Sequence, residues 1–282
     1  MGLRIQNNVE AFNAHRQLTG TAAKAAKSME KLSSGYRINR AADDAAGLGI
    51  SEKMRGQIGG LAQAQKNAQD GISAVQTAEG ALSEVHSMLQ RVRDLKVQLN
   101  NGTNDDTDKA SIGAEVAQIA SEVNDILGKT EFNGKAVFGN SFSFQVGAND
   151  NETISIAATT LSQGGAVGGL SELTQFAGAA GSAVATAMCS GDLSDISGID
   201  DMIENVSKQR GAYGAVQNRL EHRLANLATY QENLTASESR IRDVDMASEM
   251  TKFTKLNILQ QAGTSMLAQA NQGPQGVLSL LR

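Results

Sequence analysis

The sequence contains one cysteine, one proline and no tryptophan, and aromatic residues make up only 4% of its 282 positions. A single cysteine, Cys189, excludes an intramolecular disulfide. Proline interrupts helices, whereas alanine, the commonest residue here, has the highest helix propensity. Enzyme cores and pockets usually contain more aromatic mass than this. The composition therefore favours long helices over a compact catalytic domain.

The sequence also lacks long apolar runs. No stretch of about 18 apolar residues occurs, so we predict no transmembrane helix. The opening MGLRIQNNVEAF has no apolar core of about 7–15 residues, which a secretory signal peptide would need. Taken alone, these two absences would place the protein in the cytoplasm.

Charge is unevenly distributed along the chain. The net charge of −5 gives no basic bias of the kind that binds nucleic acid. Residues 1–42 carry a net +5 and residues 240–282 a net +2, so the part between them carries −12. Two basic ends therefore flank an acidic middle, although solvated faces that differ by chance would give the same pattern.

Both ends of the chain carry thin apolar stripes at helical spacing. The first stripe lies within residues 4–33, and the last repeats at near-heptad spacing until Gly273–Pro274, where we expect the helix to end. Stripes this thin bury little in an isolated chain. We therefore expect residues 1–40 and 245–282 to be largely unfolded in the monomer and to fold on assembly.

The middle of the chain shows two periods. Eight apolar positions between Val75 and Leu99 recur about every 3.4 residues, close to coiled-coil spacing. This spacing and its continuation predict helices over 61–100, 106–128 and 195–240, and a short loop makes the first two antiparallel. Apolar residues alternate instead within 131–158, which predicts a β-hairpin region, with Asn133–Gly134 as a tight turn. The Gly/Ala-rich residues 159–194 are predicted to form a loop.

The predicted fold is therefore mainly α with a small β-hairpin region, an α+β arrangement. Long antiparallel helices form a coiled-coil-like rod, and the chain folds back so that its N- and C-terminal helices pair. Cys189 would lie in the Gly/Ala-rich loop and be exposed.

No arrangement of residues indicates catalysis or a cofactor. The three histidines, His15, His86 and His222, are far apart, and none has a partner at metal-binding spacing. Asp43–Asp44 could be a paired-carboxylate site, but capping of the following helix explains it better. Residues 149–152 could bind calcium loosely, but turn chemistry explains them as well. We predict no enzyme activity, no catalytic residue, no cofactor and no metal.

Several long motifs resemble those of one family. RINRAADDAAGLGISEKMR, at residues 37–55, closely resembles the N-terminal signature of bacterial flagellins. Residues 68–95, 131–138, 218–250 and 261–281 are similar to further blocks of that family, in the same order. The resemblance covers about residues 1–158 and 195–282, and it identifies the chain as a short flagellin that lacks outer variable domains.

The resemblance implies a structural subunit that self-assembles into the flagellar filament for swimming motility. It implies an inner terminal helical domain, 1–44 with 243–282, and an outer rod domain, 45–242. Two alternatives stay open: a hook–filament junction protein, which shares the terminal helices, and a coiled-coil signalling rod, which would have no β period. Location outside the cell, in the filament, would follow export without a cleaved signal peptide.

The resemblance and the terminal stripes together imply the interaction partners. The main partner is the protein itself, in a helical homopolymer; an export chaperone, the type III export apparatus, the filament cap and hook-junction proteins are further partners. Neither nucleic acid nor membrane is expected. The residues predicted to form the subunit interface are Val9, Phe12, Leu18, Met250, Phe253, Leu256, Leu259 and Met266.

The motif QRVRDL, at residues 90–95, has two interpretations. It could be a solvated helix face, with Arg91 and Leu95 one turn apart. By resemblance, Gln90, Arg91, Leu95 and Glu115 match positions that contact neighbouring subunits and the vertebrate innate immune receptor for flagellin. Lys96 departs from the small residue common in stimulatory flagellins.

Overall fold

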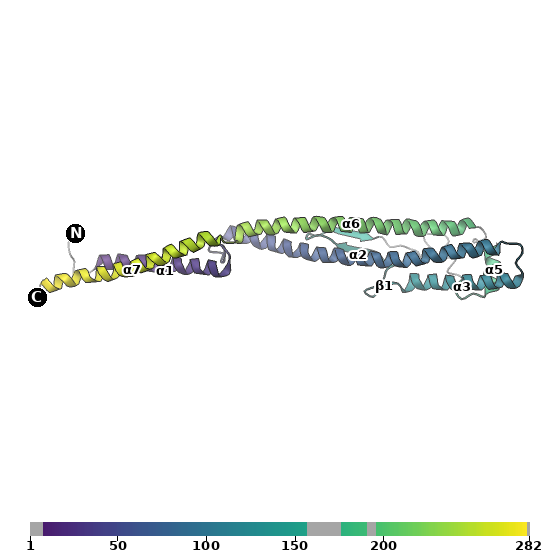
Figure 1. The fold of residues 1–282 in the computed structure, drawn as a ribbon, viewed down its shortest axis with the longest axis horizontal. Helices are drawn as coiled ribbons and strands as arrows, with labels where there is room; N and C mark the ends of the chain where they lie inside the picture. Colours follow the sequence, from purple (N-terminus) through teal and green to yellow (C-terminus); the bar gives the residue numbers. More distant parts are fainter. Residues whose placement is uncertain (1–7, 157–175, 191–195, 281–282) are drawn as a thin grey trace. The chain divides into compact units, whose positions relative to one another are not determined.

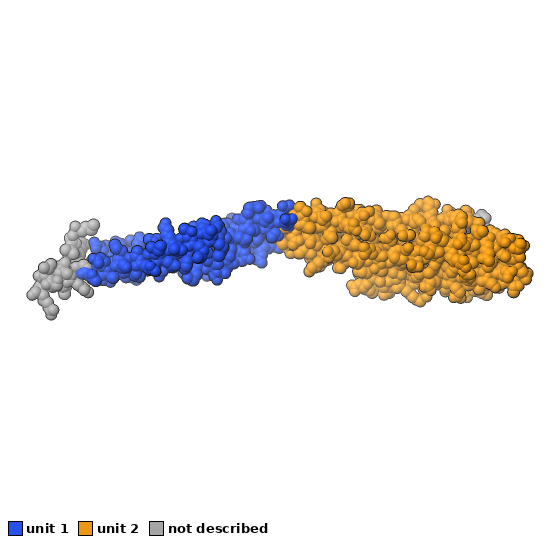
Figure 2. Space-filling view, viewed as in Figure 1, with its two compact units in different colours: residues 1–57, 232–282 blue, residues 58–231 orange. Residues whose placement is uncertain are grey.

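The computed structural model describes residues 8–156, 176–190 and 196–280, apart from the side chains of residues 189–190 and 273–280. The chain forms two compact units, residues 1–57 with 232–282 and residues 58–231 (Figure 2). The predicted domain division at residues 44/45 and 242/243 rests on resemblance and stays a prediction.

In the first unit, α1 (Val9–Ser34) packs against α7 (Met246–Leu280) (Figure 1). The two helices are antiparallel, because Asn8 bonds to Ala270 at one end of the pair and Ser28 bonds to Glu249 at the other. The predicted pairing of the N- and C-terminal helices is thus confirmed. The residues of α1 that are buried are small, Ala25 and Ser28, so the helices approach closely but bury little apolar area.

The C-terminal helix does not end where the sequence predicted. The helix α7 continues through Pro274 to Leu280, so the predicted stop at Gly273–Pro274 is wrong. Proline lacks the N–H that would bond to the carbonyl of Ala270 one turn earlier. The Asn8 side chain donates to that carbonyl instead, with Nδ2 at 2.7 Å from the oxygen. A contact across the helix pair thereby satisfies the acceptor that proline leaves unbonded.

The connector after α1 is an ordered joint. Gly35 ends the helix with a left-handed φ of 75°, which glycine adopts without steric cost. Backbone bonds then tie the connector to residues near the end of α6 (Ile196–Arg242): Arg37 N donates to Arg242 O at 2.6 Å, and Val244 N donates to Gly35 O at 3.0 Å. The Arg242 guanidinium also lies 4.8 Å from the centre of the Tyr36 ring.

The two aspartates of the connector have separate structural roles. Asp44 Oδ1 accepts a hydrogen bond from Gly47 N at 2.9 Å and caps the next helix, as the capping interpretation predicts. Asp43 forms an ion pair with Lys27 at 2.6 Å and accepts backbone N–H groups of Asn39 and Arg40. The hydrogen bond from Lys27, aided by these backbone donors, lowers the pKa of Asp43 to about 2.

The helix that Asp44 caps, α2 (Ala45–Leu99), begins earlier than predicted. The sequence predicted its start at residue 61, where the strong apolar period begins; residues 47–60 contain several glycines and few apolar residues. The cap at Asp44 and the ion pair of Arg242 with Glu52, at 2.6 Å, stabilise this first part of α2, in which the apolar pattern is weak.

The second unit contains the core. There α2 lies antiparallel to α6, since Gln65 bonds to Gln231 and Arg93 pairs with Asp200. The short loop after α2 leads into α3 (Asp106–Lys129), which also runs antiparallel to α2. All eight apolar positions of the predicted α2 row are buried: Val75, Ala78, Leu82, Val85, Leu89, Val92, Leu95 and Leu99. The coiled-coil spacing therefore identified the core-facing side of this helix.

Two antiparallel hairpins confirm the predicted β region. β1 (Glu131–Phe132) and β2 (Lys135–Ala136) are joined by Asn133–Gly134, both with positive φ. β3 (Phe142–Gln145) pairs with β4 (Thr153–Ile156). At Gly71 of α2, a Cβ atom would lie 3.1 Å from the Phe144 ring, so glycine permits the close packing of this hairpin on α2.

The predicted loop 159–194 contains a helix, α5 (Gly181–Ser190). Backbone contact between α5 and α3 explains it, because a Cβ at Gly113 would lie 2.0 Å from the carbonyl oxygen of Gly181. Val184 and Met188 of α5 are buried in the core, and the buried Lys96 donates from Nζ to the Met188 carbonyl. Cys189 thus lies on a helix rather than in a loop; its side chain lies outside the described part of the chain, and its exposure stays a prediction.

Candidate subunit interface

Large apolar side chains are exposed on both terminal helices. Phe12 is 70% exposed and Met266 is 65% exposed. Val9, Met250 and Leu259, three other predicted interface residues, are also exposed. The α1–α7 contact within one chain leaves these apolar side chains uncovered, so they are available to a partner.

The remaining predicted interface residues lie between α1 and α7 of the same chain. Leu18, Phe253 and Leu256 are partly buried, and the Leu18 side chain meets Gly263 of the opposite helix. The predicted apolar stripe therefore divides into two parts. One part pairs the helices within a chain, and the other, with Met250, Leu259 and Met266, stays exposed.

A polar pair that the sequence analysis missed sets the register of the helix pair. Glu249 is buried, accepts a hydrogen bond from Ser28 Oγ at 2.6 Å and pairs with Lys252 at 3.2 Å. The hydrogen bond from Ser28 lowers the pKa of Glu249, because it stabilises the charged carboxylate. Only one α1–α7 register brings these two groups together. A count of apolar positions misses them because both are polar.

Ile258, which the sequence analysis also missed, lies on an outer face of α7. It is 61% exposed and lines a shallow groove of about 440 Å³ with Thr251, Thr254, Lys255 and Leu259. The Thr251 and Thr254 hydroxyls donate to carbonyls of their own helix, to Ala247 O and Met250 O. These threonines therefore present mainly their methyl groups, which makes the groove more apolar than the sequence indicates.

The QRVRDL motif divides between surface and core. Gln90 and Arg91 are exposed, and Arg91 forms an ion pair with Glu115 of α3 at 2.7 Å. Leu95 is 2% exposed and belongs to the core. The interpretation of Arg91 and Leu95 as one solvated face is therefore wrong for Leu95, since position 95 also belongs to the coiled-coil row.

The described residues contain no group of three or more His, Cys, Asp or Glu side chains that could hold a metal ion. Among the described helices, none combines the length and apolar character needed to cross a membrane.

Comparison with known proteins decides the family. The description "bacterial flagellin N-terminal helical region" matches residues 5–143, and "bacterial flagellin C-terminal helical region" matches residues 196–281. The chain belongs to the bacterial flagellin family. Flagellin of Bacillus subtilis is 50% identical to it over 99% of this chain and 100% of the relative. The flagellar filament 33 kDa core protein of Treponema phagedenis is 43% identical over 99% of each chain.

One solved structure shares the fold of this flagellin family member at low sequence identity. A putative flagellar hook-associated protein from Vibrio parahaemolyticus superposes with a TM-score of 0.56 at 16% identity, covering 71% of this chain and 100% of that one. That likeness shows the fold alone. Near-full-length identity to flagellins favours flagellin over the junction protein, and the two hairpins disfavour a signalling rod.

Proposed function

We propose that this chain is the structural subunit of a bacterial flagellar filament and that it self-associates through the exposed apolar faces of α1 and α7. The observation that carries the proposal is the set of exposed side chains on this helix pair, among them Phe12, Ile258 and Met266. Family membership supports it, since relatives are named flagellin and flagellar filament core protein.

The energetics favour assembly through these helices. Burying one large apolar side chain contributes about 1.5–3 kcal/mol, and several are exposed on each chain. The α1–α7 contact within one chain, in contrast, buries mainly small residues such as Ala25. Contacts between different faces of successive copies generate a helical filament when the rotation between copies does not close into a ring.

The proposed role is structural rather than enzymatic. The exposed groove beside Ile258 is shallow and apolar, with no pair of titratable groups suited to acid–base chemistry. The same terminal helices are proposed to contact the export chaperone, the type III export apparatus, the filament cap and the hook-junction proteins. Resemblance to flagellins supports these partners, and it supports location outside the cell after export without a cleaved signal peptide.

An innate immune receptor is proposed to contact the exposed part of the QRVRDL surface. Gln90, Arg91 and Glu115 form this part, whereas the buried Leu95 is inaccessible. Recognition should therefore depend on the polar residues. Arg91→Ala should reduce receptor activation by the monomer, and Leu95→Ala, if it acts at all, should act through loss of folding.

Polymerisation of the purified full-length chain tests the proposed function. The protein is dialysed with short filament fragments as seeds, and growth is followed by sedimentation and negative-stain microscopy. Filaments of uniform diameter are expected. A chain that stays monomeric with seeds at high concentration would contradict the proposal.

A further inference from the structure

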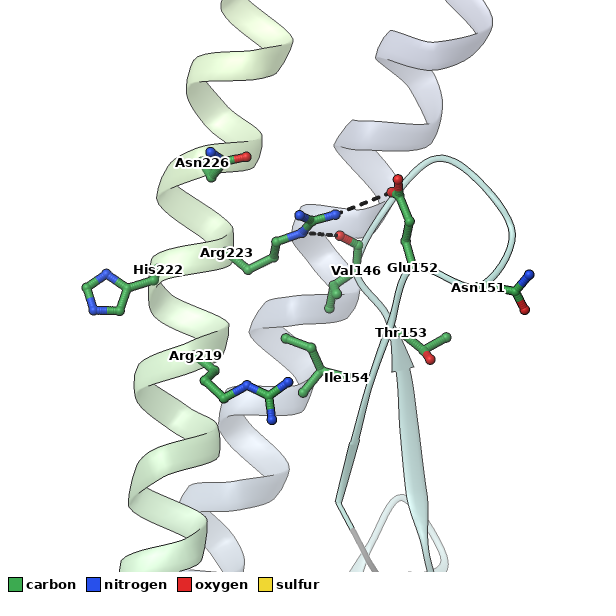
Figure 3. Close-up of a pocket in the computed structure, with 9 residues that line it drawn as sticks. All are labelled: Val146, Asn151, Glu152, Thr153, Ile154, Arg219, His222, Arg223 and Asn226. Carbon is green, nitrogen blue, oxygen red and sulfur yellow. Dashed lines mark hydrogen bonds and ion pairs between the residues drawn. The ribbon is translucent and has the colours of Figure 1, made fainter.

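A basic cleft lies in the second unit between the β3–β4 hairpin and α6 (Figure 3). It has a volume of about 540 Å³ and is lined by residues of the hairpin and by four residues of α6, Arg219, His222, Arg223 and Asn226. Figure 3 shows Arg219 and Arg223 projecting from α6 toward the hairpin, whereas His222 points away from it. Two guanidinium groups thus face the same opening.

The two arginines differ in their contacts. Arg223 is held by the hairpin, with Nε donating to Val146 O at 3.1 Å and a second nitrogen 3.3 Å from Glu152. Arg219, in contrast, has no hydrogen bond or ion pair with any residue that the structure describes. Among the described residues, Glu152 is the one carboxylate that lines the cleft. Glu152 is already engaged with Arg223, so the exposed Arg219 has no compensating charge among the residues that the structure describes.

The opposite end of the same unit is acidic. The loop between α2 and α3 and the first turn of α3 carry Asp105, Asp106 and Asp108. The Asp106 side chain is 100% exposed, and it forms a long ion pair with Lys109 of the same helix, at 3.7 Å. Asp105 and Asp108 cap α3, which fixes the backbone that presents Asp106. A fully exposed carboxylate at a capped helix start therefore projects from this end, and among the described residues only a long, exposed ion pair within α3 offsets its charge.

The two charged surfaces cannot meet within one chain. Leu220, the neighbour of Arg219 on α6, lies against Gly71 of α2, and the acidic loop follows the end of α2 at Leu99. At 1.5 Å rise per residue, these two levels of one continuous helix are about 42 Å apart. A contact between the surfaces must therefore involve two molecules.

We propose that the acidic loop of one copy, through Asp106, docks into the Arg219 cleft of a second copy and fixes the head-to-tail register of the polymer. The inference rests on the proposed filament function and adds a second contact, in the unit formed by residues 58–231. Charge complementarity is what selects this occupant, since opposite charges are presented on different surfaces of every copy. Such a contact joins different surfaces of successive copies, which is the kind of contact that a helical filament repeats.

Charge reversal in the full-length protein tests the contact. Arg219→Glu places like charges in contact and should raise the critical concentration for polymerisation at least about tenfold. Asp106→Lys should do the same. The double variant, Arg219→Glu with Asp106→Lys, restores an attractive pair with reversed sign and should return to within about threefold of wild type. Lys66→Glu is the matched control, because Lys66 is exposed at the same level of α2 but does not line the cleft.

The outcomes separate this inference from the proposed function. If wild type polymerises and Arg219→Glu behaves like Lys66→Glu, the cleft is not a subunit contact and only this inference is overturned. If the single variants fail and the double variant fails equally, a different group occupies the cleft, and the Asp106 pairing is wrong. Failure of wild type itself would overturn the proposed function together with the inference. Thermal unfolding of each monomer checks that the variants fold.

Discussion

Replacing Met266 with aspartate should block filament formation and leave the monomer intact. Met266 is 65% exposed on α7, so the isolated chain has little packing to lose at this position. In the proposed filament the same side chain is buried against a neighbouring subunit. An aspartate there would be an unpaired buried charge, which costs more than the lost apolar contact.

The magnitude follows from the exposed fraction. Fully burying a methionine side chain contributes about 1.5–3 kcal/mol, so the two-thirds still exposed in the monomer are worth about 1–2 kcal/mol on assembly. Desolvating the carboxylate adds at least a similar penalty, for a total of about 3 kcal/mol or more. Every 1.4 kcal/mol changes an equilibrium tenfold, so the critical concentration should rise roughly a hundredfold or more.

Two measurements together test the Met266→Asp prediction: the amount of polymer that sediments and the thermal unfolding midpoint of the monomer. Gln261→Asp, which places the same charge at an exposed polar position on a different face of α7, is the matched control and should polymerise. Phe253→Asp provides a contrast: Phe253 is partly buried in the single chain, so its replacement should lower the stability of the first unit as well as weaken assembly. If Met266→Asp polymerises normally, or if its monomer midpoint falls strongly, the reasoning is refuted.

Four further predictions follow from the fold. Asp43, with a pKa lowered to about 2, stabilises the first unit above the unfolded-state pKa near 3.8, and this contribution should be lost as pH falls from about 4 to 2; circular dichroism of wild type and Asp43→Asn should converge in that window. Hydrogen exchange in the monomer should be faster in α1 and α7 than in α2, because the α1–α7 contact buries mainly small residues, and it should become slow in the filament; protection of α1 and α7 equal to that of α2 in a verified monomer would count against stabilisation by assembly. Gly113→Ala should lower the free energy of unfolding by about 1–3 kcal/mol in urea, because its Cβ would meet Gly181 O. Cys189→Ser should keep motility, and a thiol reagent should label filaments at Cys189; unlabelled filaments would show that the residue is covered.

Local sequence patterns determined the elements that depend on near neighbours. The row from Val75 to Leu99 predicted both the helix and its buried side, because a helix places residues three and four apart on one face. Asn133–Gly134 predicted the tight turn, because both residues tolerate positive φ. The motif at residues 37–55 was long enough to indicate the family that the comparisons confirm.

The tertiary structure decided everything that depends on partners distant in the chain. The hydrogen bond between Ser28 and Glu249, 221 positions apart in the sequence, determines which face of α7 meets α1. Because both residues are polar, the pattern of apolar positions does not reveal them. The helix α5 forms in a Gly/Ala-rich segment because Gly113 and Gly181 allow two backbones to touch, a contact that neither glycine encodes alone. The unengaged Arg219 became visible only once the hairpin was seen to occupy Arg223 and leave Arg219 without a partner among the described residues. The period of the apolar residues determines the secondary structure of a segment. The free energy of contact between distant segments determines which faces stay exposed to a second molecule.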